Sequence, residues 1–260
     1  SNAMDYQVPS VALAARVLKL LSRHKYRQST LTEIAERLGV NKTTCLRVLR
    51  TLEREDFVSY DPQSRRYSLG PYLIPLGARA ADLNDVYAHA LAELHQVAAH
   101  TGMTAVLVKR LRDDRVIYIG SAEPPGDGVR IAVSVGQQFP VYGAAFGRCF
   151  LAYDDESTWR RVLREGLKAY TPNSITDEEE YVRLLQEVRE KGYAVSHGEL
   201  WPGISAVAVP VFNQQNKVDL VLSCLTMTSV IQGEDVERAV KALKESAAKV
   251  SAWSGYQGRA

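Results

Sequence analysis

The sequence has 260 residues, of which 46% are apolar and 24% are charged, as expected for a globular protein with one large domain or two smaller ones. No apolar run approaches the roughly 18 residues that cross a bilayer, and the first residues do not read as a secretory signal. Three scattered cysteines favour a reducing compartment and argue against zinc. We therefore expect a cytoplasmic protein with no membrane partner.

The charge is unevenly distributed along the chain. Residues 1–70 contain 12 Lys/Arg and 7 Asp/Glu, a net charge of +5, whereas residues 71–260 contain 20 and 23, a net charge of −3. A small basic end on a mildly acidic body is typical of a nucleic-acid-binding head. Chance variation in surface charge would give the same numbers. The order of the predicted helices and strands is needed to distinguish the two explanations.

Two helical patterns open the chain. The first covers residues 11–22, with Ser10 as its predicted cap. The second begins with a capping box, in which the hydroxyl of Thr30 and the carboxylate of Glu33 satisfy free amides at a helix start. It ends at Gly39, because glycine readily adopts the left-handed conformation of a helix C-cap.

A third helix and a hairpin follow. Asn41 caps a helix that continues to about Glu55. Residues 57–70 then hold two short runs rich in aromatic and β-branched residues, separated by the turn 61–64. Three helices and a hairpin in about 60 residues predict a winged helix-turn-helix.

The third helix has the side chains that DNA recognition requires. Arg47 and Arg50 are one turn apart, and an arginine fork matches the two acceptors of guanine. Small hydroxyls and a lysine in the first turn suit phosphate oxygens, and two arginines lie at the hairpin tip. The predicted DNA contacts are Lys42, Thr43, Thr44, Leu46, Arg47, Arg50, Arg65 and Arg66. The alternative is a three-helix domain with an ordinary solvated face.

The rest of the chain changes in character. Residues 74–100 predict one connecting helix. Strands are predicted at 104–111, 116–122, 129–135, 193–197, 204–212 and 218–226. Helices are predicted at 144–153, at 158–165, from a capping box at Thr176 to Lys191, and at 234–253. Because hairpins join consecutive strands, we expect an α+β fold with helices packed on an antiparallel sheet.

Three segments together identify a family resemblance. They read "LTEIAERLGVNKTTCLRVLRTLEREDFVSYDPQSRRYSLGPYLIPLG", "GQQFPVYGAAFGRCFLA" and "KGYAVSHGELWPGISAVAVPVFN". The chain resembles the IclR-type bacterial transcriptional regulators. The resemblance implies a winged helix-turn-helix domain at 8–73, a linker helix at 74–100 and a GAF-like effector-binding domain at 101–260. It also implies operator DNA and a small organic acid as partners, and a homodimer or homotetramer.

The resemblance places the effector site at a helix start. It implies that the backbone amides of Ala145 and Phe146, just before Gly147-Arg148, hold the carboxylate of the effector. Amides at a helix N-terminus attract an anion without a charged side chain. The alternative is that this glycine- and alanine-rich segment only allows close helix packing. Arg148 departs from the lysine that is usual in the family.

The pocket expected from the resemblance has lost polar groups. Ser196 stands where a polar acid is common in the family, and Ala206 stands where a cysteine is common. Aromatic and apolar residues lie in the same segments, namely Phe139, Tyr142, Trp201 and Ile204. If they point inward, they favour a hydrophobic or aromatic carboxylate over a small oxo-acid. The alternative is that these residues belong to the core.

Catalytic motifs are weak. His89 and Glu93 have a spacing that could hold a metal, but an amphipathic helix explains them better. There is no nucleophile elbow, phosphate-binding loop or dinucleotide fingerprint. We therefore predict a ligand-responsive transcriptional regulator that is not an enzyme and needs no metal or cofactor. The alternative function is a small-molecule-binding module whose helical head contacts other proteins.

Overall fold

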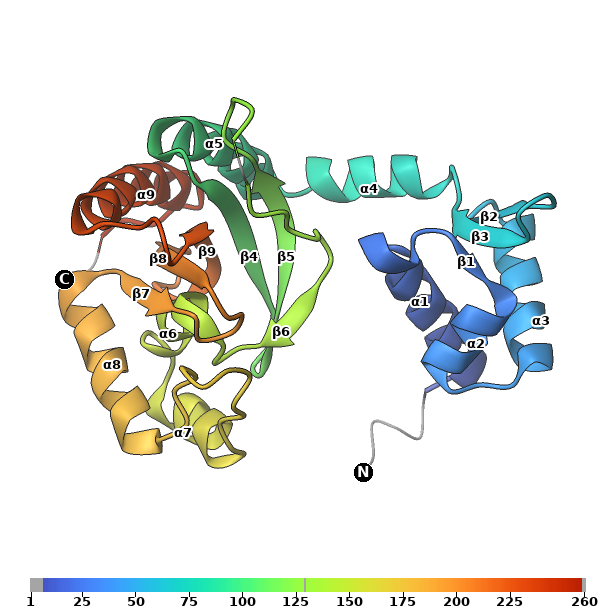
Figure 1. The fold of residues 1–260 in the computed structure, drawn as a ribbon, viewed down its shortest axis with the longest axis horizontal. Helices are drawn as coiled ribbons and strands as arrows, with labels where there is room; N and C mark the ends of the chain where they lie inside the picture. Colours follow the sequence, from blue (N-terminus) through green and yellow to red (C-terminus); the bar gives the residue numbers. More distant parts are fainter. Residues whose placement is uncertain (1–6, 129, 259–260) are drawn as a thin grey trace. The chain divides into compact units, whose positions relative to one another are not determined.

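The chain forms two compact units. The structure, a computed structural model, describes residues 7–128 and 130–258. Contacts divide the chain into an N-terminal unit, Ser1–Leu83, and a C-terminal unit, Asn84–Ala260 (Figure 1). Each unit has its own buried core, and each is described by itself.

The N-terminal unit is a winged helix-turn-helix. In chain order it contains α1 (Pro9–Leu21), the 3-10 turn η2 (His24–Tyr26), β1 (Ser29–Thr30), α2 (Leu31–Leu38), α3 (Lys42–Arg54), β2 (Val58–Asp61), β3 (Arg66–Leu69) and α4 (Leu73–Asp82). The three strands form an antiparallel sheet in the order β1-β3-β2. The predicted order of three helices followed by a hairpin is confirmed.

Side-chain caps fix the helix-turn-helix. The amide of Glu33 donates to Oγ1 of Thr30 at 3.2 Å, and the amide of Thr30 donates to Oε2 of Glu33 at 3.1 Å, which confirms the capping box. Gly39 ends α2 with a φ of 69°, and Oδ1 of Asn41 accepts from the amide of Thr44 at 2.8 Å. The caps at Gly39 and Asn41 set the turn between α2 and α3, because each satisfies backbone groups that the helix ends leave without a partner.

The first helix starts earlier than predicted. Pro9 occupies its first position and Val8 is the N-cap, so Ser10 lies inside the helix and does not cap it. Val11 is 66% exposed, whereas Leu13 and Val17 are buried. Apolar residues occupy more than one face of this segment, so their spacing alone did not fix which face is buried.

The predicted continuous linker helix over residues 74–100 is wrong. The segment forms α4 and a separate helix, α5 (Asp85–Thr101), with a break at Leu83 and Asn84. Asn84 starts the new helix, because its Oδ1 accepts from the amide of Tyr87 at 3.0 Å. The apolar spacing continues across the break and conceals it. None of the residues of α4 is buried, whereas α5 packs in the C-terminal unit.

The C-terminal unit is an antiparallel sheet covered by helices, as the predicted α+β class requires. After α5 come β4 (Thr104–Arg112), β5 (Arg115–Ala122), β6 (Gln138–Pro140), α6 (Ala144–Leu151), α7 (Glu156–Arg164), α8 (Glu178–Lys191), β7 (Ala194–His197), β8 (Ile204–Phe212), β9 (Val218–Met227) and α9 (Gly233–Trp253). The strand order is β6-β5-β4-β9-β8-β7, and every neighbouring pair is antiparallel.

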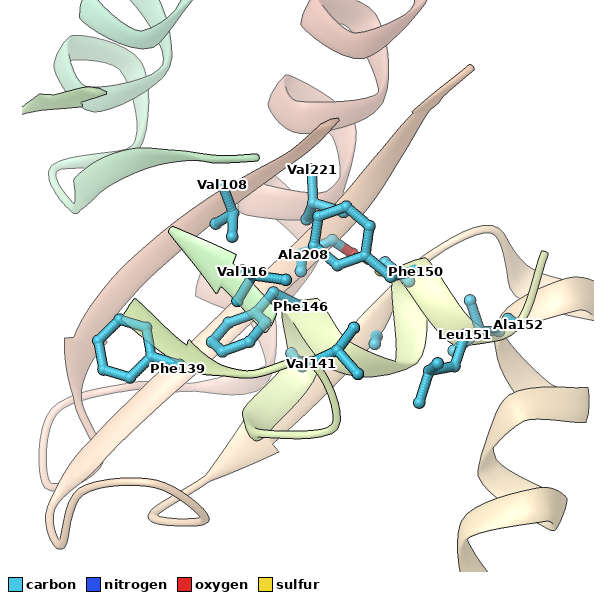
Figure 2. Packing of buried hydrophobic residues seen from close by; sticks show 14 of the residues in the cluster. Val108, Val116, Phe139, Val141, Phe146, Phe150, Leu151, Ala152, Ala208 and Val221 are labelled. Atoms are coloured by element: carbon cyan, nitrogen blue, oxygen red, sulfur yellow. Dashed lines mark hydrogen bonds between the residues drawn. The ribbon is translucent and has the colours of Figure 1, made fainter. Parts of the chain in front are cut away.

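Each face of the sheet has its own helical cover. On one face, Val207 of β8 packs in a buried cluster with Leu94 of α5 and Leu243 of α9. On the other face, Ala208 packs in a cluster with Phe146 and other residues of α6. Figure 2 shows Phe146 and Phe150 of α6 facing residues of the sheet that include Val116, Ala208 and Val221. Because side chains alternate along each strand, one face of the sheet is covered by α5 and α9 and the other by α6.

Two local predictions in this unit are wrong. No strand forms at 130–135, and residue 129 of the predicted strand lies outside the described residues. The sheet instead takes the three-residue strand β6, which is too short for an alternation signal. The cap of α8 is Asp177, whose Oδ2 accepts from the amide of Glu180 at 2.9 Å, so the helix starts one residue after the predicted Thr176 box.

Candidate operator and effector sites

Helix α3 presents a polar face and buries an apolar one. Cys45 and Leu49 are fully buried against α1 and α2, and Leu46 is half-buried. The exposed residues among the predicted DNA contacts of this helix are Lys42, Thr43, Thr44, Arg47 and Arg50. Asn41 accepts the hydrogen bond of one backbone amide in the first turn of α3, that of Thr44. The other amides of this turn can donate to an anion.

Grooves run along both flanks of α3. One, of about 550 Å³, has Leu46 and Arg50 on one side and the start of α2 and the wing residue Arg65 on the other. The second, of about 450 Å³, lies between α3 and α1 and is lined by Thr44 and Arg47. Arg47 and Arg50 thus occupy different flanks of the exposed face, so the two side chains can reach different base pairs.

The two wing arginines differ in their surroundings. Arg65 is exposed at the turn with a left-handed φ of 58°. Arg66 is bound within the unit, because its Nη1 donates to the carbonyl of Gln28 at 3.0 Å and lies 3.4 Å from Oε2 of Glu33. The wing turn is held by Asp61, whose pKa is lowered by hydrogen bonds from Ser64 and from the amide of residue 63. Arg65 is therefore the wing arginine free to meet a partner, while Arg66 braces the wing.

The start of α6 has an unusual backbone. Ala144 has a φ of 51°, a left-handed conformation that is costly for a residue with a Cβ atom. A Cβ atom at Gly147 would lie 2.3 Å from the carbonyl of Val141, so glycine allows α6 to pack directly on the preceding segment. No hydrogen bond among the described residues uses the amides of Ala145 and Phe146. A left-handed residue followed by helical ones turns successive amides to one side, the geometry of an anion-binding nest.

Aromatic residues gather beside this helix start. The ring centroid of Phe139 lies 6.0 Å from that of Phe146 and 5.1 Å from that of Trp201, the latter edge to face. Phe139 and Phe146 are 5% and 2% exposed, so for these two the core alternative holds. Tyr142, Trp201 and Ile204 are half-buried, so part of each side chain remains accessible.

The structure brings the predicted effector residues together. Ala206 and Ser196 are direct partners across β8 and β7, and both are buried. One hydrophobic cluster contains or contacts every candidate except Ser196, namely Phe139, Tyr142, Ala145, Phe146, Ile204 and Ala206. The segments are far apart in sequence, and the fold places these residues near one another.

A buried ion pair behind the helix start was not predicted. Nη1 of Arg148 lies 2.7 Å from Oε1 of Glu199, and its Nη2 donates to Oε2 of the same residue at 3.1 Å and to the carbonyl of Val195 at 2.6 Å. The two side chains are 3% and 12% exposed. The pair ties α6 to the turn between β7 and β8, which also carries Trp201. Residues 51 positions apart give no local signal of such a contact.

The candidate metal residues of α5 make other contacts. The ring of His89 stacks on Trp253 at 3.7 Å, and Glu93 accepts a hydrogen bond from Ser246 at 2.8 Å. Within residues 7–128 and 130–258, no group of three His, Cys, Asp or Glu side chains is arranged to hold a metal ion. None of the helices in those ranges has the length and apolar character needed to cross a membrane.

A winged helix-turn-helix joined to an effector domain defines a class of DNA-binding regulators, and comparison with known proteins identifies the family. Residues 10–62 match the IclR helix-turn-helix domain, and residues 78–252 match the C-terminal domain of the bacterial transcriptional regulator IclR. The chain belongs to the IclR family.

Individual relatives align over nearly the whole chain. The transcriptional regulator KdgR of Escherichia coli is 30% identical over 97% of this chain and 96% of its own, and XynR of the same species is 28% identical over 96% and 98%. Among solved structures, IclR of Thermotoga maritima has a TM-score of 0.75 at 25% identity, covering 96% of this chain and 100% of that chain. An IclR homologue of Microbacterium hydrocarbonoxydans, complexed with 4-hydroxybenzoate, has a TM-score of 0.78 at 21% identity, covering 94% and 98%.

The protein is therefore a ligand-responsive, DNA-binding transcriptional regulator. The N-terminal unit binds DNA and the C-terminal unit binds a small molecule. The alternative of a head that contacts only proteins is not supported, because the head belongs to a DNA-binding family. Its relatives are transcriptional regulators, which agrees with the weakness of every catalytic motif in the sequence.

Proposed function

We propose that the effector is an aromatic or hydrophobic carboxylate bound at the start of α6. Its carboxylate accepts hydrogen bonds from the amides of Ala145 and Phe146, and its apolar part contacts Tyr142, Trp201 and Ile204. The observation that carries the proposal is the pair of free amides behind the left-handed Ala144. Such donors, at the positive end of a helix, suit an anion.

The surroundings favour an apolar ligand body. The buried pair Ser196 and Ala206 offers one hydroxyl and no charge, and Arg148 is neutralised by Glu199. A small oxo-acid has further polar groups that would lose water without gaining partners here. The ligand of the Microbacterium homologue, 4-hydroxybenzoate, has the proposed chemistry.

A thermal-shift screen tests the effector class. Benzoate and 4-hydroxybenzoate are compared with pyruvate and glyoxylate, and hits are confirmed by calorimetry. A ligand present at 100 times its Kd stabilises the folded state by about 2.7 kcal/mol, so the melting temperature rises measurably. Trp201→Ala weakens binding of the aromatic acids, whereas Trp253→Ala, a change outside the cluster, leaves it unchanged. If only the oxo-acids raise the melting temperature, the effector is not aromatic.

For the operator we propose a division of roles along α3 and the wing. Arg47 and Arg50 contact base edges, Leu46 approaches a thymine methyl group, and residues 42–44 contact phosphates. Arg65, at the tip of the wing, contacts the phosphate backbone of the DNA. Arg66 contacts DNA only if it leaves Glu33, so its main role is to brace the wing.

We further propose a homo-oligomer that acts in the cytoplasm, where the chromosome is accessible. Helix α4 has no buried residue. Ile74 within it and Leu83 directly after it are 75% and 82% exposed, so a second copy of the chain is proposed to cover this segment. Two heads would then read half-sites about one helical turn, or a multiple of it, apart. Sedimentation of the protein and of Ile74→Ser tests this, and a wild-type monomer at micromolar concentration contradicts it.

A further inference from the structure

A cluster of cations surrounds one tyrosine of the N-terminal unit. Arg23 and Lys25 lie 5.3 and 5.5 Å from the ring centroid of Tyr26, and Arg37 of α2 lies 5.4 Å from it. We call these four residues the Tyr26 patch. Lys25 and Arg37 are exposed, and Arg23 and Tyr26 are half-buried. Three positive charges on one ring form a separate feature from α3 and the wing turn.

Among the described residues, no acidic side chain forms an ion pair with this patch. Residues 7–32 include five Lys/Arg and not one Asp or Glu. Two acids lie near Arg37 along the chain. Glu36 forms no ion pair among the described residues, and Glu33 is already used by Arg66 and by the cap of α2. No ion pair among the described residues involves Arg23, Lys25 or Arg37. The three charges repel one another, and the tyrosine ring offsets part of that repulsion.

The patch is connected to the DNA-facing side of the unit. Oγ of Ser29 donates to the carbonyl of Tyr26 at 2.7 Å, and β1 pairs with the wing strand β3. Thr30, at the end of β1, lines the groove that also contains Arg50 and Arg65. Tyr26 and Thr30 are four positions apart in the chain, a span of at most about 14 Å. The patch thus lies within a few base pairs' reach of the groove.

We propose that the Tyr26 patch binds phosphates of the operator DNA that flank the half-site read by α3. Unpaired cations on a DNA-binding unit match the charge of the phosphate backbone, and an arginine or lysine held on a tyrosine ring keeps its charge and its donors. These contacts carry no sequence information. They lengthen the footprint and increase affinity for operators embedded in longer DNA.

Nested duplexes test the proposal. One duplex ends at the outer edges of the two half-sites, and a second extends beyond each edge by roughly one helical turn of about 10 base pairs. Binding is measured by fluorescence anisotropy across a range of salt concentrations, for the wild-type protein and for the triple variant Arg23→Gln, Lys25→Gln and Arg37→Gln. Each phosphate contact contributes about −0.9 to the slope of log K against log salt. On the extended duplex, the slope for the triple variant should therefore be shallower than that for the wild type by roughly 2 to 3 per head. The short duplex should bind both proteins equally.

Two controls keep the test specific. Arg189→Gln, Lys191→Gln and Lys241→Gln remove the same charge from exposed positions of the C-terminal unit and should change nothing. Arg23→Lys with Arg37→Lys keeps the charge and should bind like the wild type. Unchanged slopes for the glutamine variant on the extended duplex overturn the proposal. An equal loss on both duplexes also overturns it, because the charges would then act on the half-site itself.

Discussion

The two units use charge in opposite ways. In the N-terminal unit, the arginines of α3 and of the Tyr26 patch are mostly exposed and have no acidic partner among the described ion pairs. In the C-terminal unit, Arg148 and Arg110 are 3% and 10% exposed and are paired with Glu199 and Asp154. The exposed, unpaired cations of the N-terminal unit are available to DNA, whereas the buried, paired ones of the C-terminal unit stabilise its fold. Substitutions should therefore separate binding from stability, unit by unit.

The largest expected effect on stability is at the buried pair. Arg148→Met leaves Glu199 buried without its partner, which costs roughly 3–5 kcal/mol. Arg160→Met breaks an exposed pair with Glu156 and should cost less than about 0.5 kcal/mol. Urea unfolding measures both. Replacing both partners, Arg148→Met with Glu199→Leu, should recover much of the loss. Equal losses for the two single variants would show that the buried pair has no special structural role.

Buried thiols predict a loss of stability at alkaline pH. Burial raises the pKa of both Cys149 and Cys224 to about 12, from 9.0. The folded state favours the neutral thiol, so this stability is complete below pH 9 and is lost as the pH rises from 9 towards 12. At pH 10 the loss is on the order of 1 kcal/mol per thiol. Urea unfolding at pH 8 and pH 10 measures it, and Cys149→Ala with Cys224→Ala should flatten the dependence. A wild-type curve as flat as that of the variant contradicts the account.

Helix caps allow the two units to be compared directly. Asn41→Ala removes the cap of α3 and Asp177→Ala removes the cap of α8, each at a cost of about 1 kcal/mol. All three tryptophans lie in the C-terminal unit, so their fluorescence reports that unit alone. Asn41→Ala should shift the circular dichroism transition but not the fluorescence transition, and Asp177→Ala should shift both. Identical shifts for the two variants would mean that the units unfold as one.

The smallest effect concerns the backbone of the proposed anion site. Ala144→Gly relieves a left-handed conformation, so it should be neutral or stabilise the protein by less than about 1 kcal/mol. Ala248→Gly, at an exposed position inside α9, should destabilise it by about 1 kcal/mol. Thermal unfolding of the two variants shows whether their changes in stability have opposite signs. A clear destabilisation by Ala144→Gly would show that the alanine methyl group itself makes an important contact.

Local signals were sufficient for much of the fold. The capping box at Thr30, the cap at Asn41 and the wing turn were predicted correctly because each depends on residues within a few positions. The prediction of one continuous linker helix was wrong because the apolar spacing continues through Asn84, where a side-chain cap starts a new helix. No strand forms at 130–135, within the strand predicted at 129–135, because alternating β-branched residues do not by themselves provide a strand to pair with.

The sequence was enough to predict which residues of α3 are exposed, but not which residues far apart in the chain contact one another. Exposure of Arg47 and Arg50 follows from the amphipathic pattern of one helix, so the sequence was enough. The ion pair between Arg148 and Glu199, and the brace between Arg66 and Glu33, join residues 51 and 33 positions apart, and only the fold brings them together. The left-handed Ala144 was also missed, because alanine gives no signal for that conformation.

The most direct test of the central claim is operator binding by the recognition helix. Mobility shifts use duplexes tiling the DNA around the protein's own gene, near physiological salt and with random duplex as competitor. Arg47→Ala with Arg50→Ala is compared with the wild type and with Arg189→Ala plus Lys191→Ala. We predict that one fragment is shifted by the wild type and by the control, and that the α3 variant binds it about 30-fold more weakly or worse, since each base contact contributes roughly 1–3 kcal/mol. If the α3 variant shifts that fragment as well as the wild type does, α3 does not read the operator.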